Sequence, residues 1–433
     1  MSEIIKIGLL GCGTVGTGVV KVLQENMHEI LPKVGAELKI THVLVHNLSK
    51  NRHLPADINL TDDINDILND SNVEIVVELL GGIHPAREYM LKAMQAGKNV
   101  VTANKDVVAQ FGKDMFAAAE KYNVDFMFEA SVGGGIPIIT PLKQCLTANK
   151  ITEVIGIVNG TTNYMLTKMS EENACYDDVL KAAQEKGYAE ADPTADVEGL
   201  DAARKTAILA SIAFNSRVDL DKVSTEGITK ITPQDIAYAK ELGYTIKLLS
   251  VSRENELGID VRVHPALLPQ THPLAFVRNE FNAIFVRGNA VGETMFYGRG
   301  AGQLPTASAV IADIIDVARD IIKNRFGRIG CTCYEHKPFC PIEKTISSYY
   351  VRLLVDDQPG VLGTIAMAFG QTGVSLNAVI QKRKVDTCAE IVAISHEVQE
   401  EKIRKAEQTL NNLPAVKKIC NIIRVEPPTS QEI

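Results

Sequence analysis

A strand, a glycine turn and a helix follow one another within the first 31 residues, and this order constrains the fold more than any other feature. The apolar run at 4–10 is short enough for a buried parallel strand, and the pattern GCGTVG at 11–16 follows at once. The helical stretch that comes next is expected to end before Pro32. A lone GxGxxG pattern is weak, but in this context it is typical of a dinucleotide-binding turn. The sequence therefore predicts a Rossmann-type nucleotide-binding domain, with a chance glycine turn as the alternative.

Each glycine of the pattern has a separate physical role in such a site. Gly11 permits the tight turn, Gly13 lets a pyrophosphate approach the backbone, and Gly16 lets helix and strand pack closely. The helix presents free N–H groups and the positive end of its dipole to the phosphates. We therefore expect the phosphates to lie against residues 11–16.

The sequence after the second expected strand, 38–45, bears on the choice between NAD and NADP. NAD-specific sites usually end this strand with Asp or Glu, which holds the ribose 2′-hydroxyl. Here residues 46–52 contain no acid, and Lys50 and Arg52 could contact a 2′-phosphate. A solvated basic loop is the alternative. The segment therefore favours NADP, or use of both cofactors.

Strands and helices continue to alternate as far as residue 105, and ligands in open α/β sheets bind beyond the carboxyl ends of the strands. Four residues follow strand ends and are expected at one crevice: Gly81, Gly82, Thr102 and Lys105. Lys105 also opens a helix, where a cation is mildly unfavourable, and a residue placed against local preference indicates function. A surface lysine is the alternative.

Two further strand ends carry polar groups. Glu129 follows the strand expected at 124–128 and precedes the glycines at 133–135, a loop whose carbonyls could turn inward to bind a hard cation. Alternatively, these glycines let the chain leave the nucleotide-binding domain. The segment NGTTNY at 159–164 follows the strand expected at 151–158, and it either caps its own helix or binds a carboxylate there.

Residues 187–205, GYAEADPTADVEGLDAARK, form the densest group of charges in the chain. Gly187 ends the helix expected at 177–186, and an acidic loop then leads to a second, longer helix. Asp201 and Lys205 are four residues apart and share one face of that helix. Such a pair is usually a surface ion pair, but with the neighbouring acids it also suits a site that grips a ligand ammonium.

The last part of the chain, 349–426, is expected to form a separate unit. Its pattern predicts strands at 350–355, 374–380, 387–394 and 416–425, with one helix that ends near Gly373 and another at 399–410. This β-α-β-β-α-β order is the ferredoxin-like arrangement. Pairing of its sheet edges implies a homo-oligomer.

Two other segments leave alternatives open. Gly302 lies in a glycine-rich turn before the helix expected at 307–323, and it either lets backbone approach the cofactor or forms a flexible return between domains. Four residues superficially resemble a zinc cluster: Cys331, Cys333, His336 and Cys340. Their spacing is not a standard zinc signature, so a reduced linker is expected.

Composition excludes several classes of protein. The net charge of −8 and the absence of a long basic run argue against a nucleic-acid partner. No apolar stretch approaches the roughly 20 residues that span a bilayer. The N-terminus does not look like a secretory leader, and the eight cysteines are sparse, which suits reduced thiols. We expect a cytoplasmic protein with no membrane partner.

Six segments together resemble homoserine dehydrogenase, and the resemblance covers about residues 1–325. They are GCGTVG at 11–16, VTANK at 101–105, EASVGGGIP at 129–137, NGTTNY at 159–164, the highly specific stretch at 187–205, and GRGAGQLPTASAV at 298–310. The turn DQPGVL at 357–362, with Asn377 in the next strand, resembles the ACT domain, which binds amino acids between paired copies; a plain dimerisation module is the alternative.

The resemblance implies roles for individual residues. It makes Lys205 the acid/base lysine and Lys105 a second active-site lysine. The implied substrate-binding residues are Glu190, Asp201, Asp196, Thr161, Gly160, Tyr188 and Gly187. The implied cofactor-binding residues are Gly11, Gly13, Thr14, Val15, Gly16, His46, Lys50, Arg52, Gly81, Thr102, Lys105 and Gly302. The implied cation site is Glu129 with Val132, Gly134 and Ile136, and the implied threonine contacts are Gly360 and Asn377. Family members often carry Arg where His46 stands, which leaves the NADP preference open.

The family link implies NAD- or NADP-dependent interconversion of L-homoserine and L-aspartate 4-semialdehyde, in the biosynthesis of threonine, methionine and isoleucine. It also implies a bound sodium or potassium ion, feedback inhibition by threonine, and a homodimer or homotetramer. The α/β chain is expected to divide into a nucleotide-binding domain at 1–135, onto which a helix at 303–325 packs, an α+β substrate and dimerisation domain at 136–302, a linker at 326–348, and the ferredoxin-like ACT domain at 349–426.

Two alternatives to this function remain. A different nicotinamide oxidoreductase could use the pocket at 187–205 for another small amino acid or its aldehyde. A non-catalytic amino-acid sensor could have kept the fold, although four intact residues argue against it: Lys105, Glu190, Asp201 and Lys205.

Overall fold

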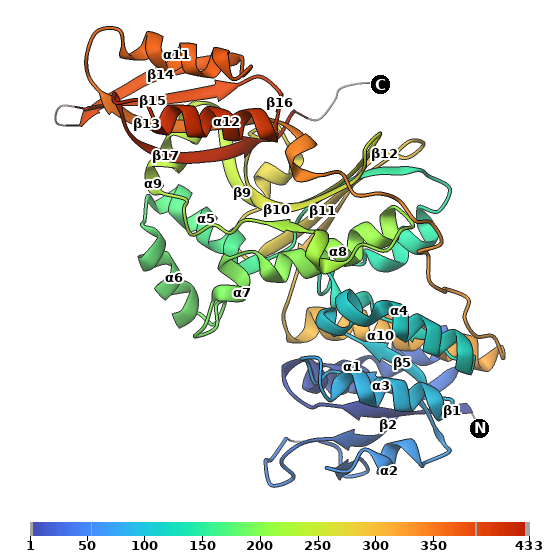
Figure 1. Cartoon of the computed structure of the whole chain (residues 1–433). Coiled ribbons are helices and arrows are strands. Elements are labelled where there is room, and N and C mark those ends of the chain that lie inside the picture. The colour runs from blue at the N-terminus through green and yellow to red at the C-terminus, as the bar shows by residue number, and fades with distance from the viewer. Residues whose placement is uncertain (1–2, 53, 386–387, 429–433) are drawn as a thin grey trace. The chain divides into compact units, whose positions relative to one another are not determined.

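The computed structural model describes residues 3–52, 54–385 and 388–428 (Figure 1). The chain forms two compact units. The first comprises Met1–Val154, Arg204–Lys222 and Asn282–His336, and the second comprises Ile155–Ala203, Val223–Phe281 and Lys337–Ile433. No helix among the described residues is both long enough and apolar enough to cross a membrane.

The first unit contains a six-stranded parallel sheet with the strand order β3-β2-β1-β4-β5-β6. Its strands are β1 (Glu3–Leu10), β2 (Ala36–Leu44), β3 (Asn59–Thr61), β4 (Val73–Glu78), β5 (Asn99–Thr102) and β6 (Phe126–Met127). The helices between them are α1 (Thr14–Val34), α2 (Asn65–Leu68), α3 (Ala86–Gln95) and α4 (Lys105–Tyr122). This order is that of dinucleotide-binding Rossmann folds, so the expected fold class is confirmed.

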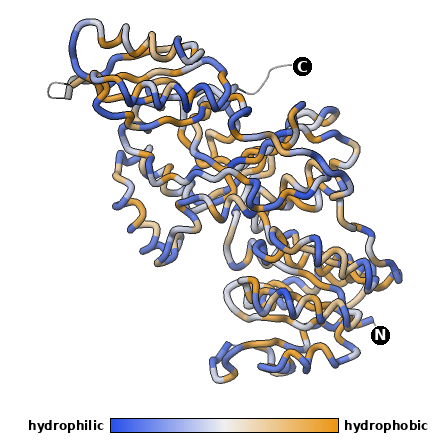
Figure 2. The backbone as a smooth tube through the Cα atoms, viewed as in Figure 1, coloured by the Kyte–Doolittle hydropathy of each residue, from blue (hydrophilic) through white to orange (hydrophobic). Residues whose placement is uncertain are grey.

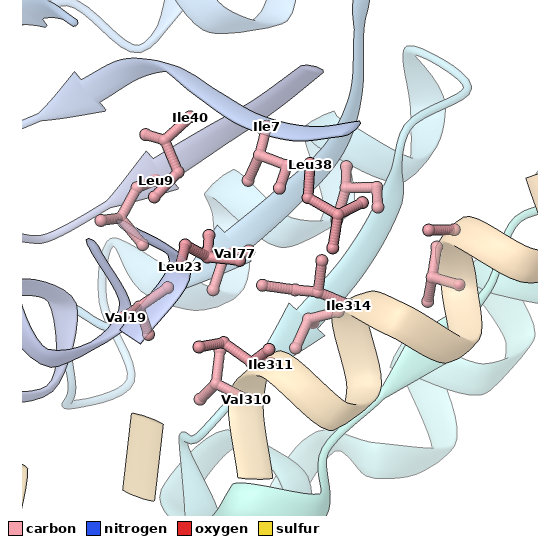
Figure 3. Packing of buried hydrophobic residues seen from close by; sticks show 14 of the residues in the cluster. Ile7, Leu9, Val19, Leu23, Leu38, Ile40, Val77, Val310, Ile311 and Ile314 are labelled. Carbon is pink, nitrogen blue, oxygen red and sulfur yellow. The ribbon is translucent and has the colours of Figure 1, made fainter. Parts of the chain in front are cut away.

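The core of this sheet includes a helix from much later in the sequence. Side chains of α10 (Gln303–Ile322) pack with those of β1, β2, β4 and α1 in one buried cluster (Figure 3). Ile311 and Ile314 of α10 face Val77 of β4 in this cluster, and all three are nearly inaccessible to solvent. Burial of such side chains, about 1.5–3 kcal/mol each, holds α10 on the sheet although it begins at Gln303, 225 residues after β4 ends at Glu78.

One expected helix boundary was wrong, and another was expected at two alternative positions. α1 does not end before Pro32 but continues to Val34, where Gly35 ends it with φ 91°. A proline in the last turn costs only one hydrogen bond, and this helix is held by its buried face. α10 begins at Gln303, as expected of the helix at 303–325 and a full turn before the start at 307, because Pro305 is compatible with the first turn of a helix.

The second unit contains the helices that follow residue 159 and a long antiparallel hairpin. The helices are α5 (Gly160–Glu172), α6 (Tyr176–Glu185), the short α7 (Thr194–Val197), the start of α8 (Leu200–Ala213) and α9 (Pro233–Glu241). The hairpin consists of β9 (Tyr244–Asn255) and β10 (Gly258–Pro269), which pair along their whole length. The helix α7 was not expected, since its segment was read as an acidic loop.

The C-terminal part of the second unit has the expected β-α-β-β-α-β order. Its elements are β13 (Ile346–Asp356), α11 (Val361–Gln371), β14 (Leu376–Val385), β15 (Cys388–Ser395), α12 (Glu400–Asn411) and β17 (Val416–Val425), with the strand order β17-β13-β15-β14. Thr387, the first residue of one expected strand, lies outside the described residues. In Figure 2 α12 is mostly hydrophilic, and only its buried face, with Ile403, Ala406 and Leu410, joins the core.

This ferredoxin-like part is joined to the rest of its unit in two ways. Strand β17 pairs in parallel with β10 at Ala266 and Leu267. In addition, the buried Arg352 on β13 binds Asp235 on α9 (Nε–Oδ1 2.7 Å) and Glu390 on β15 (Nη1–Oε1 3.0 Å). A buried pair of this kind is costly to break, so it fixes α9 against the sheet.

Candidate active site

The glycine turn after β1 has the geometry that a pyrophosphate requires. Gly11 has φ 98°, and a Cβ at Gly16 would lie 2.3 Å from the carbonyl oxygen of Gly11. A Cβ at Gly13 would meet no protein atom within 4 Å. Gly13 also caps α1 without any side-chain hydrogen bond. The space at Gly13 and the uncapped first turn therefore fit a phosphate group.

The loop after β2 shows that Arg52 does more than present a charge. Its Nη1 donates to the carbonyl oxygens of Asn47 (2.8 Å) and Lys50 (2.9 Å) and so folds the loop. The side chains of His46 and Lys50 are exposed. Bonds of this kind between a side chain and loop carbonyls leave no signal in the sequence, which offers only a phosphate ligand or a solvated basic loop for Arg52.

Glu78, at the end of β4, forms hydrogen bonds that connect the ends of β4 and β5. Its carboxylate accepts hydrogen bonds from Thr102 Oγ1 (2.6 Å) and from the N–H groups of Leu80 (2.7 Å) and Gly81 (3.2 Å). Burial raises the pKa of Glu78 above its usual range. Thr102 and Gly81 are thus brought together as expected, but by a residue that sequence reasoning missed. An acid inside an apolar strand was the available signal.

Asn104 organises the start of α4. Its Oδ1 accepts from Val107 N–H (3.2 Å), and its Nδ2 donates to Gly82 O (2.6 Å). The prediction that Lys105 opens a helix is confirmed, and its side chain is half-buried. Asn104, which fixes that position and ties it to Gly82, was not singled out from the sequence.

The helices that carry the two candidate catalytic lysines are joined by an ion pair between the residues next to those lysines. Arg204, beside Lys205 on α8, has its Nε 2.6 Å from Oδ1 of Asp106, which follows Lys105 on α4. Both partners are about three-quarters buried. The pair therefore fixes the part of α8 that carries Lys205 against the first turn of α4.

Asn159 links two of the candidate substrate-binding acids. Its Nδ2 donates to Asp196 Oδ1 (2.7 Å) and to Asp201 Oδ2 (3.0 Å), while its Oδ1 accepts from Thr162 N–H (2.9 Å). The prediction that this segment caps its own helix is confirmed. The same amide also holds two carboxylates together, which the sequence did not indicate.

The remaining candidates lie around the start of α5. Thr161 Oγ1 donates to Tyr188 O (2.6 Å), and the rings of Tyr188 and Tyr164 are 5.0 Å apart. Gly160 is the first residue of α5, and Gly187 follows α6 with φ 73°, as expected of a residue just past a helix end. Glu190 lies on the loop beyond, with its side chain exposed.

A buried lysine beneath this segment was missed by sequence reasoning. Lys247 on β9 donates to Asn163 Oδ1 (2.8 Å) and to Val277 O (2.5 Å). Burial, helped by the charge of Arg278, lowers the pKa of Lys247 to about 7. Two acceptors match the two N–H donors of a neutral amine, so the geometry and the pKa agree. An alternating strand pattern would have assigned Lys247 to a solvent face.

Glu129 is buried, and three backbone N–H groups hold its carboxylate. They belong to Ile138 (2.6 Å), Ile139 (2.8 Å) and Thr140 (2.7 Å). Its own N–H donates to Asp313 Oδ2 (2.8 Å), whose pKa is raised well above its usual range by burial and by the nearby Glu129. Glu129 thus anchors the loop that was expected to bind a cation. Among the described residues, no cluster of three or more His, Cys, Asp and Glu side chains suits a metal ion.

The two glycine-rich segments of the first unit pack backbone against backbone. Gly135 N–H donates to Arg299 O (3.1 Å), and a Cβ at Gly134 would lie 2.4 Å from the carbonyl oxygen of Gly300. Gly302 follows with φ 124° and forms the N-cap of α10. These glycines are therefore needed for close packing, and they are more than a flexible exit or return of the chain.

The ferredoxin-like part has a cavity of about 360 Å³ beside the turn that leads into α11. Gly360, with φ 88°, lines it together with Asp357, Gln358 and Gln381. Its size suits an amino acid. Asn377 is exposed on β14 and is not among the residues that line this cavity.

Three family models match consecutive parts of the chain. They are described as homoserine dehydrogenase, NAD binding domain (residues 11–129), homoserine dehydrogenase (137–315) and ACT domain (349–415). Among curated relatives, the homoserine dehydrogenase of Synechocystis sp. is 46% identical over 97% of this chain and 99% of its own length. That of Bacillus subtilis is 44% identical over 98% of each chain.

Solved structures give the same result. A homoserine dehydrogenase from Thiobacillus denitrificans is similar with a TM-score of 0.94 and 42% identity, covering 98% of this chain and 99% of that one. One from S. aureus has a TM-score of 0.77 and 36% identity over 98% and 99%. A hyperthermophilic archaeal homoserine dehydrogenase in complex with NADPH has a TM-score of 0.63 and 25% identity over 73% and 98%.

The glycine turn generates a paired prediction. Gly13→Ala adds a methyl group where no protein atom lies, so we expect unfolding stability within about 0.5 kcal/mol of wild type and NADPH binding at least about tenfold weaker. Gly16→Ala forces a methyl group onto a backbone oxygen and should cost about 1–3 kcal/mol of stability. Thermal unfolding and titration of NADPH fluorescence measure the two effects. Normal NADPH affinity in Gly13→Ala contradicts phosphate binding at this turn.

Lys247 generates a prediction about pH. Its pKa is about 7 in the folded chain but keeps the ordinary lysine value of about 10.4 in the unfolded chain, so between these values the unfolded state binds more protons. Burying the protonated Lys247 ammonium lowers the free energy of unfolding. This cost is fully present below pH 7 and decreases as pH rises, by up to about 1.4 kcal/mol per pH unit. Lys247→Met should remove this dependence between pH 7 and 9 in urea unfolding, whereas exposed Lys222→Met should not. If the pH dependence of stability is unchanged in Lys247→Met, the lowered pKa of Lys247 is refuted.

Proposed function

This chain belongs to the homoserine dehydrogenase family, and from that premise we propose that it interconverts L-homoserine and L-aspartate 4-semialdehyde in the biosynthesis of threonine, methionine and isoleucine. It is an oxidoreductase that acts on a CH–OH group and has a nucleotide-binding domain. The observation that carries the proposal is 46% identity to a homoserine dehydrogenase over 97% of the chain.

The proposed substrate pocket is built to hold a small zwitterion. The ammonium group of homoserine needs negative partners, and Glu190 and Asp201 supply them. Asp196 supports this pocket through Asn159, which donates to both Asp196 and Asp201. The other proposed lining residues are Gly160, Thr161, Gly187 and Tyr188, of which Thr161 and Tyr188 are directly hydrogen-bonded.

Lys205 is the proposed acid/base. When homoserine is oxidised, its hydroxyl must lose a proton as hydride leaves the carbon, and a neutral Lys205 amine can accept that proton. In the reverse direction, the Lys205 ammonium protonates the forming alkoxide. Lys105 is the proposed second cation of the site, and the ion pair between Asp106 and Arg204 supports a fixed placement of both lysines. When bound, the nicotinamide accepts or donates the hydride.

The proposed cofactor site follows the carboxyl edge of the first sheet. Its residues are Gly11, Gly13, Thr14, Val15, Gly16, Gly81, Thr102, Lys105 and Gly302, with His46, Lys50 and Arg52 near the adenosine ribose. We favour NADP because Lys50 is exposed after β2 and residues 46–52 contain no acid. The NADPH in the archaeal relative is consistent with this choice.

We further propose a monovalent cation, sodium or potassium, at the loop of Glu129, with the backbone carbonyls of Val132, Gly134 and Ile136 as ligands. Oxygen donors of this kind suit a hard cation. The three N–H groups on the Glu129 carboxylate use only some of its lone pairs, so a carboxylate oxygen can also contact a cation.

The C-terminal ACT domain is the proposed sensor of threonine. The cavity beside Gly360 has the size of an amino acid, and the exposed Asn377 on β14 is the second proposed contact, offered to a ligand held between paired copies. Paired copies imply a homodimer or homotetramer. We propose that the enzyme works in the cytoplasm on freely diffusing substrates.

The acid/base role predicts a specific loss of turnover. Lys205→Ala should lower kcat for homoserine oxidation by at least about 100-fold, because general acid/base catalysis typically contributes that much. Its Kd for NADPH should stay within about threefold of wild type. Lys222→Ala, which changes an exposed lysine beyond the end of α8, is the control and should keep kcat. Equal losses of turnover and cofactor binding in Lys205→Ala contradict the role.

The sensor role predicts inhibition by threonine that depends on Asn377. A steady-state assay of homoserine oxidation should show faster turnover with NADP than with NAD. The rate should fall as threonine is added. Asn377→Ala should raise the threonine concentration for half-inhibition about tenfold, while Asn412→Ala, at the exposed residue that follows α12, should not. If threonine does not inhibit the wild-type enzyme, the proposal that threonine is the ligand of this domain is wrong.

A further inference from the structure

Two cysteines outside the proposed active site lie close together among cationic side chains. Cys331 and Cys333 follow α10, and neither forms a disulfide. Arg217 Nη2 lies 3.4 Å from the sulfur of Cys331, which is exposed. The thiol of Cys333 is partly buried and lies 3.6 Å from the carbonyl oxygen of Ser211 on α8. One thiol is therefore accessible, and the other lies behind it.

The surroundings favour a thiolate on Cys331. The thiol and the backbone N–H of Cys333 both hydrogen-bond to it, and with the charges of Arg217 and Lys143 they lower the pKa of Cys331 to about 5. The pKa of Cys333 is raised, chiefly by the same hydrogen bond and by burial. The hydrogen bond and the cations thus favour the thiolate form of Cys331 and the thiol form of Cys333.

The second cation is positioned by aromatic rings. Lys143 is 9% exposed, and its Nζ lies 4.7 Å from the ring centre of Phe116 and 5.4 Å from that of Phe128. Burial lowers the pKa of Lys143 to about 8, although the neighbouring cysteines act in the opposite direction and raise it. Burying a cation is costly, and a nearby thiolate offsets this cost. The lysine and the thiolate thus stabilise each other.

Cys331 is accessible to a molecule larger than water. It lies with Cys333 and Arg217 in the wall of a cleft of about 650 Å³, which also contains the side chains of Lys113 and His336. A cleft of this size can admit a small disulfide or peroxide. The two cysteines also line a smaller cavity together with Phe116 of α4 and with Ala207 and Ser211 of α8.

We propose that Cys331 and Cys333 are a redox-active dithiol, with Cys331 as the attacking thiolate and Cys333 as the resolving thiol, and that a low-molecular-weight disulfide is the oxidant. An accessible thiolate beside cations with a second thiol in contact is the arrangement that thiol–disulfide exchange requires. A metal site is disfavoured, since no cluster of metal-ligating side chains exists among the described residues.

The reaction balances in two steps. The Cys331 thiolate attacks one sulfur of the small disulfide, which forms a mixed disulfide and releases one small thiolate. Cys333 then loses its proton and attacks the Cys331 sulfur, which forms the Cys331–Cys333 bond and releases the second small thiolate. Counted from two thiols, the protein loses two protons and two electrons, and the small disulfide takes them up to become two small thiols. Excess thiol reverses both steps.

The test uses the full chain and oxidised glutathione as the probe. Peptide mass mapping after incubation should show a loss of two hydrogens in the peptide that contains 331–333, reversed by dithiothreitol. Cys333→Ser should instead accumulate one glutathione on Cys331, and Cys331→Ser should show neither change. Retained Cys333 reactivity in Cys331→Ser, or no trapped mixed disulfide in Cys333→Ser, overturns the assignment of roles. Thermal unfolding verifies that both variants are folded.

A matched thiol provides the control. Cys175 is also exposed, but its sulfur lies 3.0 Å from a carboxylate oxygen of Asp178 instead of a cation. At pH 6.5, iodoacetamide should label Cys331 at least about tenfold faster than Cys175, because only Cys331 has a stabilised thiolate. Arg217→Met should reduce that ratio. Equal labelling rates at the two sites refute the proposal whatever the enzyme's catalytic activity.

Discussion

The spacing of two side chains along one helix determines most of the proposed chemistry. α8 carries Asp201 and Lys205 four residues apart, so the proposed ammonium ligand and the proposed acid/base rise from the same side of one rigid element. Their neighbours fix that element at both positions. Asn159 holds the Asp201 carboxylate, and the ion pair between Arg204 and Asp106 fixes the next turn against α4. Proton transfer needs precise placement, and the ion pair between Arg204 and Asp106 supports it for the turn that carries Lys205.

The polar groups that hold the site are buried and multiply bonded. Glu78, Glu129 and Asn159 each satisfy two or three partners from different parts of the chain. A buried polar group without partners costs about 1–3 kcal/mol, so each set is stable only when all its members are in place. The candidate site residues are therefore positioned by a layer of side chains with no direct role in the reaction.

The ACT domain is attached to the substrate-binding part of its unit by side chains and backbone. Asp235 forms a capping box with Thr232 at the start of α9 and also binds Arg352 on β13. One carboxylate therefore connects the start of this helix to the domain. α9 in turn packs against α5, whose first residues are Gly160 and Thr161. A ligand that shifts β13 would thus act on the helix beside the proposed substrate pocket, which gives a regulatory domain a physical connection to it.

Local patterns predicted much of this structure, and long-range contacts explain what they missed. The glycine turn, the position of Lys105 at a helix start and the ferredoxin-like order all follow from short segments, and all were found. Asn104, Lys247 and the bonds of Glu129 depend on partners that only the folded chain brings near. The end of α1 was misplaced because the rule for Pro32 ignores how strongly the buried face holds the helix.

The central claim is that Lys205 and Lys105 act on an amino acid whose ammonium is held by Glu190 and Asp201 beside the nicotinamide. A crystal structure of the complex with NADP and homoserine tests it most directly. We expect the homoserine hydroxyl within hydrogen-bonding distance of Lys205 Nζ and the homoserine ammonium against the two carboxylates. A bound homoserine that contacts neither the lysines nor those acids would contradict it.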